Sequence, residues 1–177
     1  TNDDLTRYVL AVYGQNRFGS GVAISDSRVA TSCHTLQGAR FVGVVNQDLS
    51  IKRIAARGMT MPGWDVCLLH FDIPHGFPVP PIGTVASAVS GGVVTAIGSS
   101  NGQLSSVTGP VLGTEGVPGG GAILNSDTPV SPGASGGGLF NGEGALVGII
   151  TYIASDRQGR RAGNYSAPID WAIELNR

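Results

Sequence analysis

Short β-type segments separated by turn residues run through the whole chain, and they constrain its fold most. Six such segments lie on each side of residues 74–81, where prolines break any regular pattern. Two sets of six short strands suit two small antiparallel barrels, because a closed barrel leaves no strand edge unpaired. We therefore predict an all-β protein with two six-stranded antiparallel β-barrels, over residues 1–78 and 79–177. The predicted strands are residues 8–13, 19–24, 28–32, 41–45, 51–56 and 66–71, then 92–99, 104–114, 122–125, 138–140, 146–153 and 165–167.

The segment 169–175 has a different pattern, with apolar residues at helical spacing. Pro168 precedes it and Asp170 lies in its first turn, and both residues favour a helix N-terminus. We predict a short C-terminal helix that packs on the second barrel.

The composition excludes several classes of function. The chain has 177 residues, of which 41% are hydrophobic and 13% are charged, so it can bury a sizeable core. A formal net charge of −1 provides no basic field for nucleic acid. No apolar run is long enough to span a membrane. Two cysteines without further ligands at short spacing do not indicate a metal site. We predict no nucleic-acid partner, no membrane span, no metal and no cofactor.

A serine lies among glycines in the run Pro-Gly-Ala-Ser-Gly-Gly-Gly at residues 132–138. Glycines let the backbone fold tightly around Ser135 and point N–H groups at one spot. Acyl transfer needs this arrangement, because a hydroxyl nucleophile must lie beside donors that hold a developing oxyanion. The run alone is a weak indication, since 28 of the 177 residues are glycine.

The best candidate for a general base is His34, which ends a short predicted strand. This strand follows residues 19–24 across a turn at Asp26 and Ser27. Histidine titrates near neutral pH, so it can take up and return a proton under physiological conditions. A lone histidine is more often a surface residue or a hydrogen-bonded core residue, so His34 needs partners to indicate catalysis.

The third candidate is Asp65, which begins an almost wholly apolar segment. An acid at the start of a buried strand needs a hydrogen-bonded partner, because an unpaired buried charge is costly. The N–H of a catalytic imidazole is such a partner, and the pairing fixes the tautomer of the ring. Asp48 and Asp72 compete for this role, but both lie in polar or Pro-rich surroundings that favour solvation.

The stretches around these three residues resemble trypsin-like serine proteases, and among them the bacterial HtrA/Deg-type proteases. The candidate residues follow the order of that family, with histidine before aspartate and aspartate before serine. The resemblance implies a chymotrypsin-like fold and a serine endopeptidase that acts on protein or peptide substrates in a secreted or periplasmic bacterial location. The matching stretches are residues 19–22, 30–34, 65–69, 127–137 and 147–151.

The same resemblance assigns roles to individual residues. His34, Asp65 and Ser135 form a catalytic triad in the cleft between the barrels, and the N–H groups of Gly133 and Ser135 form the oxyanion hole. Pro129 stands where a trypsin-like specificity pocket carries its acid, which predicts a small or medium apolar residue at the P1 position of the substrate. The expected substrate-binding residues are Thr128, Pro129, Val130, Thr151, Tyr152, Ile153, Gly163, Asn164 and Tyr165.

Two cysteines flank the proposed base and acid. Cys33 precedes His34, and Cys67 lies two residues after Asp65. If His34 and Asp65 touch, the sulfurs could form a disulfide between the two segments. The alternative is two buried free thiols that act as small hydrophobes. We favour the free thiols, because the directions in which the side chains face are not encoded in the sequence.

Two other functions are compatible with this sequence. The chain could be a non-catalytic peptide-binding module on a protease scaffold, since fold does not dictate function. It could also be a serine esterase that uses the same triad. The presence of all three candidate residues favours the protease over the binding module. The oligomeric state is not predicted.

Overall fold

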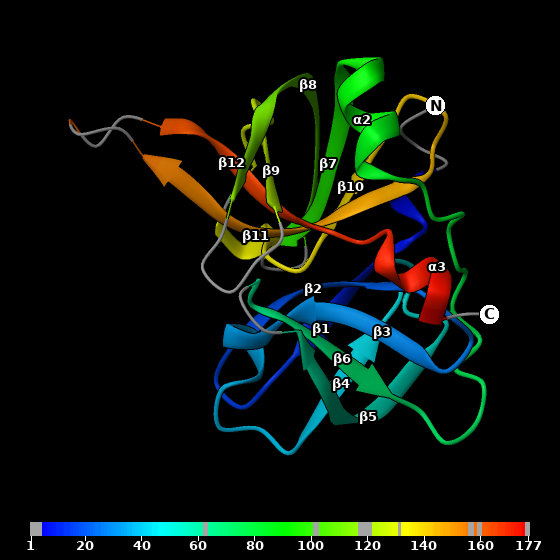
Figure 1. Ribbon diagram of the computed structural model, residues 1–177. Coiled ribbons are helices and arrows are strands. Elements are labelled where there is room, and N and C mark those ends of the chain that lie inside the picture. The colour runs from blue at the N-terminus through cyan, green and yellow to red at the C-terminus, as the bar shows by residue number, and fades with distance from the viewer. Residues whose placement is uncertain are drawn as a thin grey trace.

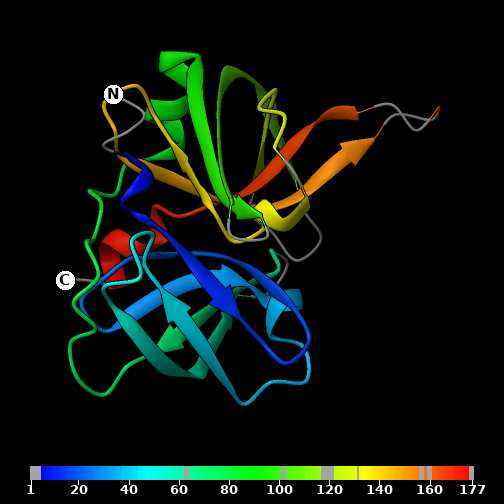
Figure 2. The same cartoon turned by 180° about the vertical axis from the view of Figure 1, so that it is seen from behind.

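The structure is a computed structural model of the chain and describes residues 5–61, 64–100, 103–116, 122–130, 132–155, 158 and 161–175. Two closed β-barrels lie one above the other, with the second barrel uppermost in Figure 1. Figure 2 shows the same stacking from behind. The predicted all-β fold of two six-stranded antiparallel barrels is confirmed.

The first barrel contains the six N-terminal strands in the order β1-β2-β3-β6-β5-β4, and β4 pairs with β1 to close it. Every neighbouring pair is antiparallel. The strands are β1 (Val9–Tyr13), β2 (Phe18–Ala23), β3 (Arg28–Ser32), β4 (Phe41–Val45), β5 (Lys52–Met61) and β6 (Val66–His70).

The second barrel has the order β10-β11-β12-β9-β8-β7, and β7 pairs with β10 to close it. All twelve predicted strands exist, and most differ from the prediction by a few residues at their ends. The strands are β7 (Val93–Ser100), β8 (Gln103–Gly116), β9 (Ala122–Ser126), β10 (Gly138–Phe140), β11 (Leu146–Ser155) and β12 (Arg161–Pro168).

The predicted C-terminal helix is α3 (Trp171–Leu175), which lies beside the boundary between the barrels in Figure 1. A second helix, α2 (Val85–Gly91), was not predicted. Thr84 caps its N-terminus in a reciprocal pair with Ser87, and Gly92 ends it in the left-handed conformation. Among the described residues, no helix has the length and apolar character needed to cross a membrane.

Three buried clusters stabilise the structure. One fills the first barrel and another fills the second. The third lies between the barrels and takes residues from both, so that the two halves share a core. Its buried members are Tyr8, Val9, Val22, Ile24, Ala30, Val66 and Leu68 from the first half, with Ile97, Phe140, Leu146, Ile149, Ala167, Ile169 and Ala172 from the second.

His75 lies between β6 and α2 and is 1% exposed. Its Nε2–H donates to the carbonyl of Ser25 at 2.6 Å, and its Nδ1 accepts from the N–H of Phe77 at 2.9 Å. Both bonds require the neutral ring, because a proton on Nδ1 would face a donor. Burial lowers the pKa of His75 below its ordinary value. These contacts make His75 a structural residue of the first half of the chain.

The buried neutral state of His75 predicts a loss of stability in mild acid. The unfolded imidazole takes up a proton with a pKa near 6.5, whereas the folded imidazole does so only at lower pH. Between those two values the unfolded state binds more protons, so the free energy of unfolding falls as the pH drops below about 6.5. Urea unfolding between about pH 7 and pH 5 measures this slope, and His75→Gln should flatten it.

The exposed His70 provides the matched control, because its side chain is 52% accessible. His70→Gln should leave the pH dependence close to that of the wild type. Equal slopes in His75→Gln and the wild-type protein would refute the role assigned to His75.

Candidate active site

His34 and Asp65 meet in short segments just outside the strands of the first barrel. His34 lies in η1 (Cys33–Leu36), a 3₁₀-helix that directly follows β3. Asp65 directly precedes β6 and has a φ of 55°, in the left-handed region. Its Oδ2 lies 2.5 Å from Nδ1 of His34. The predicted contact between base and acid therefore exists.

The surroundings of Asp65 differ from the prediction. The side chains of His34 and Asp65 are 46% and 39% accessible, so the acid is not buried at the start of its strand. The apolar strand begins one residue later at Val66, and the left-handed turn directs Asp65 to the surface. Asp48 and Asp72 are solvated as expected. Asp48 bonds only within its own turn, and the side chain of Asp72 is 99% accessible.

The cysteines form a disulfide, so the expectation of free thiols was wrong. Cys33 and Cys67 are bonded, with their Cα atoms 5.0 Å apart. Both segments leave the β3–β6 ladder at the same end, where Ser32 pairs with Val66. This common end turns the two sulfurs toward each other, which the spacing of the cysteines in the sequence could not reveal.

Ser135 directly follows η2 (Pro132–Ala134), a single 3₁₀ turn, and lies three residues before the start of β10. Its hydroxyl donates to the carbonyl of Thr151 at 3.2 Å, and it is half-buried. Gly136 has a φ of 90°, and a Cβ there would lie 2.0 Å from the carbonyl oxygen of Ser20. Only glycine suits that position, because a side chain would face both strain and a backbone clash.

Ser20 of β2 connects the first barrel to the turn that carries Ser135. Its N–H donates to the carbonyl of Ser135 at 3.0 Å. Its hydroxyl accepts from the N–H of Ser99 at 2.7 Å and lies 3.4 Å from the carbonyl of Gly133. These bonds cross the boundary between the barrels and hold the Ser135 turn against β2.

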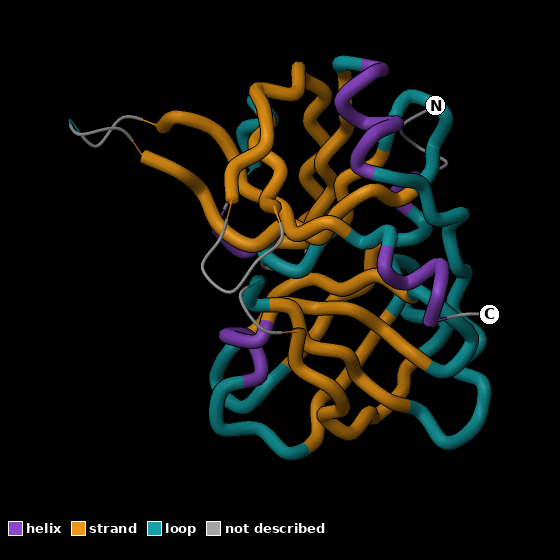
Figure 3. Tube along the Cα trace, in the orientation of Figure 1, coloured by secondary structure: helices purple, strands orange, loops and turns teal. Residues whose placement is uncertain are grey.

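Gly19 separates the Ser135 turn from the His34 turn. A Cβ on Gly19 would lie 2.6 Å from Oγ1 of Thr35 and 3.1 Å from the carbonyl oxygen of Ser135. Thr35 directly follows His34 in the same turn. The His34 turn and the Ser135 turn therefore both contact Gly19, and only the backbone of Gly19 separates them there. Figure 3 shows the two short helices, η1 and η2, on the same side of the molecule at the boundary between the barrels.

The predicted substrate-binding residues lie in several different surroundings. Thr128 and Asn164 are fully buried and bonded, with Nδ2 of Asn164 donating to the carbonyl and to Oγ1 of Thr128. Val130 packs in the core of the second barrel, whereas Pro129 is exposed. The remaining ones lie on β11 and β12, namely Thr151, Tyr152, Ile153, Gly163 and Tyr165, and the side chains of Tyr152 and Ile153 lie outside the described residues.

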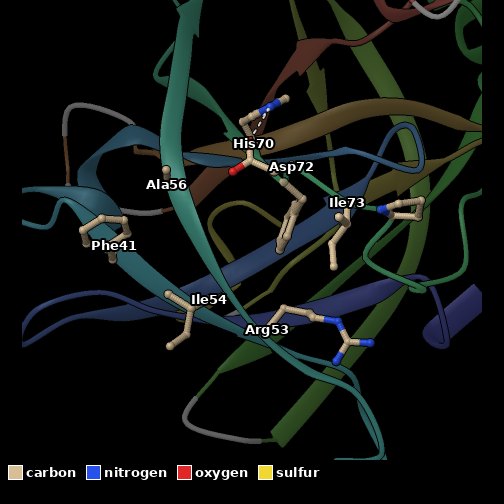
Figure 4. A pocket seen from close by; sticks show the side chains of 9 residues that line it. Phe41, Arg53, Ile54, Ala56, His70, Asp72 and Ile73 are labelled. Carbon is tan, nitrogen blue, oxygen red and sulfur yellow. Dashed lines mark ion pairs between the residues drawn. The ribbon is translucent and has the colours of Figure 1, made fainter.

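A hollow of about 460 Å³ lies elsewhere, on the outside of the first barrel (Figure 4). Phe41, Ile54 and Ile73 line it together with His70 and Asp72, and none of the predicted site residues contributes. In the part of the chain that the structure describes, no group of three or more His, Cys, Asp or Glu residues could hold a metal ion.

Comparison with known proteins identifies the family. A family model described as the trypsin-like peptidase domain matches residues 19–149. The chain belongs to the trypsin-like peptidase family. This match covers Gly19, His34, Asp65 and Ser135, so all the turns described above lie within the trypsin-like region. The resemblance predicted from the sequence is confirmed.

Individual relatives narrow the comparison to HtrA-type proteins. The "Probable periplasmic serine endoprotease DegP-like" of Pseudomonas fluorescens is 33% identical over 167 residues, which are 89% of this chain and 34% of that protein. The structure of HtrA-type protease AlgW with a tripeptide superimposes with a TM-score of 0.81 and 26% identity, over 96% of this chain and 59% of that one. This trypsin-like chain therefore spans about a third of the length of its curated relatives.

A second structure supports the fold alone. The MamO protease domain of Magnetospirillum magneticum in its apo form superimposes with a TM-score of 0.79, over 100% of both chains and with 24% identity. The structure of this chain thus superimposes on two kinds of trypsin-like chain: a domain of the same extent, and part of the longer AlgW chain.

The hydrogen bonds of Ser20 across the boundary between the barrels predict that their removal lowers the free energy of unfolding. Ser20→Ala removes the acceptor of the Ser99 N–H and leaves this buried group unpaired, which typically costs about 1–3 kcal/mol. Chemical denaturation of both proteins gives the difference in the free energy of unfolding.

Ser90→Ala is the matched control, because Ser90 is exposed on α2. Its effect should stay within about 0.5 kcal/mol. An equally small effect of Ser20→Ala would show that the Ser20 bonds do not hold the barrels together.

Proposed function

We propose that this chain is a serine endopeptidase domain in which His34, Asp65 and Ser135 act as a catalytic triad. The observation that carries the proposal is the joint arrangement of two turns around Gly19. One turn holds His34, which is bonded to the carboxylate of Asp65. The other turn is rich in glycine and carries the hydroxyl of Ser135. Nucleophilic catalysis at a serine requires this set of groups.

The contact between His34 and Asp65 determines which ring nitrogen acts as the base. Nδ1 faces the carboxylate, so it carries the proton that Asp65 accepts. Nε2 is then the basic nitrogen, which takes the proton of Ser135 as Oγ attacks the scissile carbonyl. Asp65 stabilises the imidazolium that forms. The hydroxyl of Ser135 donates to the carbonyl of Thr151 in the structure, so this bond must be released when the hydroxyl proton passes to Nε2.

The next steps follow from the same groups. The N–H groups of Gly133 and Ser135 hold the oxyanion, and His34 returns the proton to the leaving amine. Water then attacks the acyl-enzyme with His34 again acting as the base, and Ser135 is regenerated. The bond from the Ser20 N–H to the Ser135 carbonyl holds the peptide group that follows Ser135, and so limits the movement of the turn that carries the nucleophile.

Extended peptides are the proposed substrates. In the described residues, β10 pairs with β11 only as far as Ile149, whereas β12 continues to pair up to Ser155. One edge of β11 after Thr151 therefore has no strand beside it, and an extended substrate can add there as a further strand. Figure 1 shows the ends of β11 and β12 projecting beyond the second barrel, to the left. The related AlgW protease was solved with a tripeptide.

The proposed P1 preference is a small or medium apolar residue such as Ala, Val or Leu. Thr128 and Asn164 satisfy each other through hydrogen bonds and carry no charge, so they offer no partner for a charged P1 side chain. Asp127 is exposed, which fits a turn acid better than a specificity determinant.

A secreted or periplasmic location is proposed on two grounds. Disulfides such as Cys33–Cys67 persist mainly in oxidising compartments. The relative from Pseudomonas fluorescens is named as periplasmic.

The triad predicts covalent labelling of Ser135. A fluorophosphonate probe should add one phosphonyl group, seen as a mass shift that maps to Ser135, and Ser135→Ala should abolish both labelling and casein cleavage. Ser90→Ala, which changes an exposed serine, should label and cleave like the wild type. Sequencing of the casein products should show Ala, Val and Leu at P1.

The outcomes separate the competing functions. Absence of labelling together with intact casein would leave only the peptide-binding module. Labelling with cleavage of small esters but not of casein would indicate an esterase. Either result would refute the proposed endopeptidase.

A further inference from the structure

We infer that the Cys33–Cys67 disulfide positions the His34–Asp65 pair, and that a thiol reductant opens it and lowers turnover while the protein stays folded. This inference rests on the proposed function. It concerns how the base and the acid are held together, and it makes the site sensitive to thiols.

The disulfide joins the two segments at the point where they carry the site residues. Cys33 is the first residue of η1 and precedes His34, whereas Cys67 is the second residue of β6 and follows Asp65 by two positions. One backbone bond accompanies it, from the N–H of Cys33 to the carbonyl of Asp65 at 2.9 Å. Beyond the end of the β3–β6 ladder, the backbones of the two segments are therefore linked by the disulfide and by this hydrogen bond.

The other contacts of His34 and Asp65 do little to fix the positions of the two side chains. Both side chains are well exposed, and an exposed ion pair contributes little to stability because water screens it. The 3₁₀ turn that carries His34 is one turn long, and Ser32 does not cap its backbone, although the Ser32 hydroxyl bonds to Oγ1 of Thr35 at 2.7 Å. Asp65 holds a left-handed backbone conformation, which is unfavourable for a residue with a side chain. The geometry thus depends on the backbone, which the disulfide ties in place.

The two sulfurs differ in a way that favours one route of opening. Cys33 is partly exposed, whereas Cys67 is fully buried. The guanidinium of Arg57 lies 3.6 Å from Sγ of Cys67, and the hydroxyl of Thr60 lies 3.5 Å from it. Both groups can donate to a thiolate at Cys67 and make it the better leaving group.

The exchange proceeds in two steps. An external thiolate attacks Sγ of Cys33, the bond between Cys33 and Cys67 breaks, and the electron pair leaves on Cys67 beside Arg57. A second thiolate then attacks the external sulfur of the mixed disulfide and releases Cys33. Two protons are taken up, so two external thiols are oxidised to one disulfide and the cysteine pair is reduced to two thiols.

Reduction of the wild-type protein tests the inference. Dithiothreitol treatment, with the two thiols counted by iodoacetamide mass shift, should lower kcat by about 10²-fold while KM changes little, because a small misplacement of the base costs about that much. The low-field proton resonance of the His34 Nδ1–H should be present in the oxidised protein and lost after reduction. Reoxidation should restore both readouts. The near-UV circular dichroism of the reduced protein should stay native.

Three variants serve as controls. The double variant Cys33→Ala, Cys67→Val should behave like the reduced wild type and should not respond to dithiothreitol. Arg57→Gln should slow the reduction severalfold and leave the activity of the oxidised protein unchanged. Arg40→Gln, which changes an exposed neighbouring arginine, should alter neither property.

The outcomes distinguish this inference from the proposed function. An oxidised protein that shows the low-field resonance but neither labels nor cleaves would overturn the proposed function alone. A reduced protein with unchanged kcat and an unchanged resonance would overturn the positioning role alone. If activity is lost only together with the native near-UV spectrum, the positioning role is also overturned. The disulfide would then stabilise the whole fold and not the His34–Asp65 geometry in particular.

Discussion

The contact between β2 and the Ser135 turn is the constraint on which the rest of the structure depends. Ser20 bonds through its N–H to the carbonyl of Ser135 and through its hydroxyl to the backbone of Ser99. Gly136 allows the approach, because any side chain there would overlap the carbonyl of Ser20. A shared core buries residues of both barrels, so the two parts of the proposed site are held on one packed unit.

The proposed site is built on turns that a rigid scaffold holds. His34 lies in a 3₁₀ turn after β3, Asp65 in a left-handed turn before β6, and Ser135 after a second 3₁₀ turn before β10. Each turn begins or ends at a strand of a closed barrel, whose ladder fixes its direction. Loops on a rigid scaffold commonly carry functional residues in this way. The disulfide adds a second fixed point at the His34 and Asp65 turns.

Sequence patterns predicted the barrels well, because strand alternation and turn residues are local signals. The order of His34, Asp65 and Ser135 also pointed to the family that the comparison confirms. Helix α2 was missed because it has only seven residues, among them two valines and two serines that are poor helix formers, and the reciprocal cap between Thr84 and Ser87 stabilises it. The disulfide and the exposure of Asp65 depend on how β3 and β6 end together. That is a tertiary feature, which no local pattern encodes.

A crystal structure with a peptidyl boronic acid tests the central claim most directly. Such a compound, with valine at the P1 position, forms a covalent adduct that imitates the tetrahedral intermediate. Our account predicts boron bonded to Oγ of Ser135, one boronate oxygen at the N–H groups of Gly133 and Ser135, and Nε2 of His34 within hydrogen-bond distance of the adduct. An unmodified Ser135, or an adduct with the His34 ring turned away from it, would contradict the account.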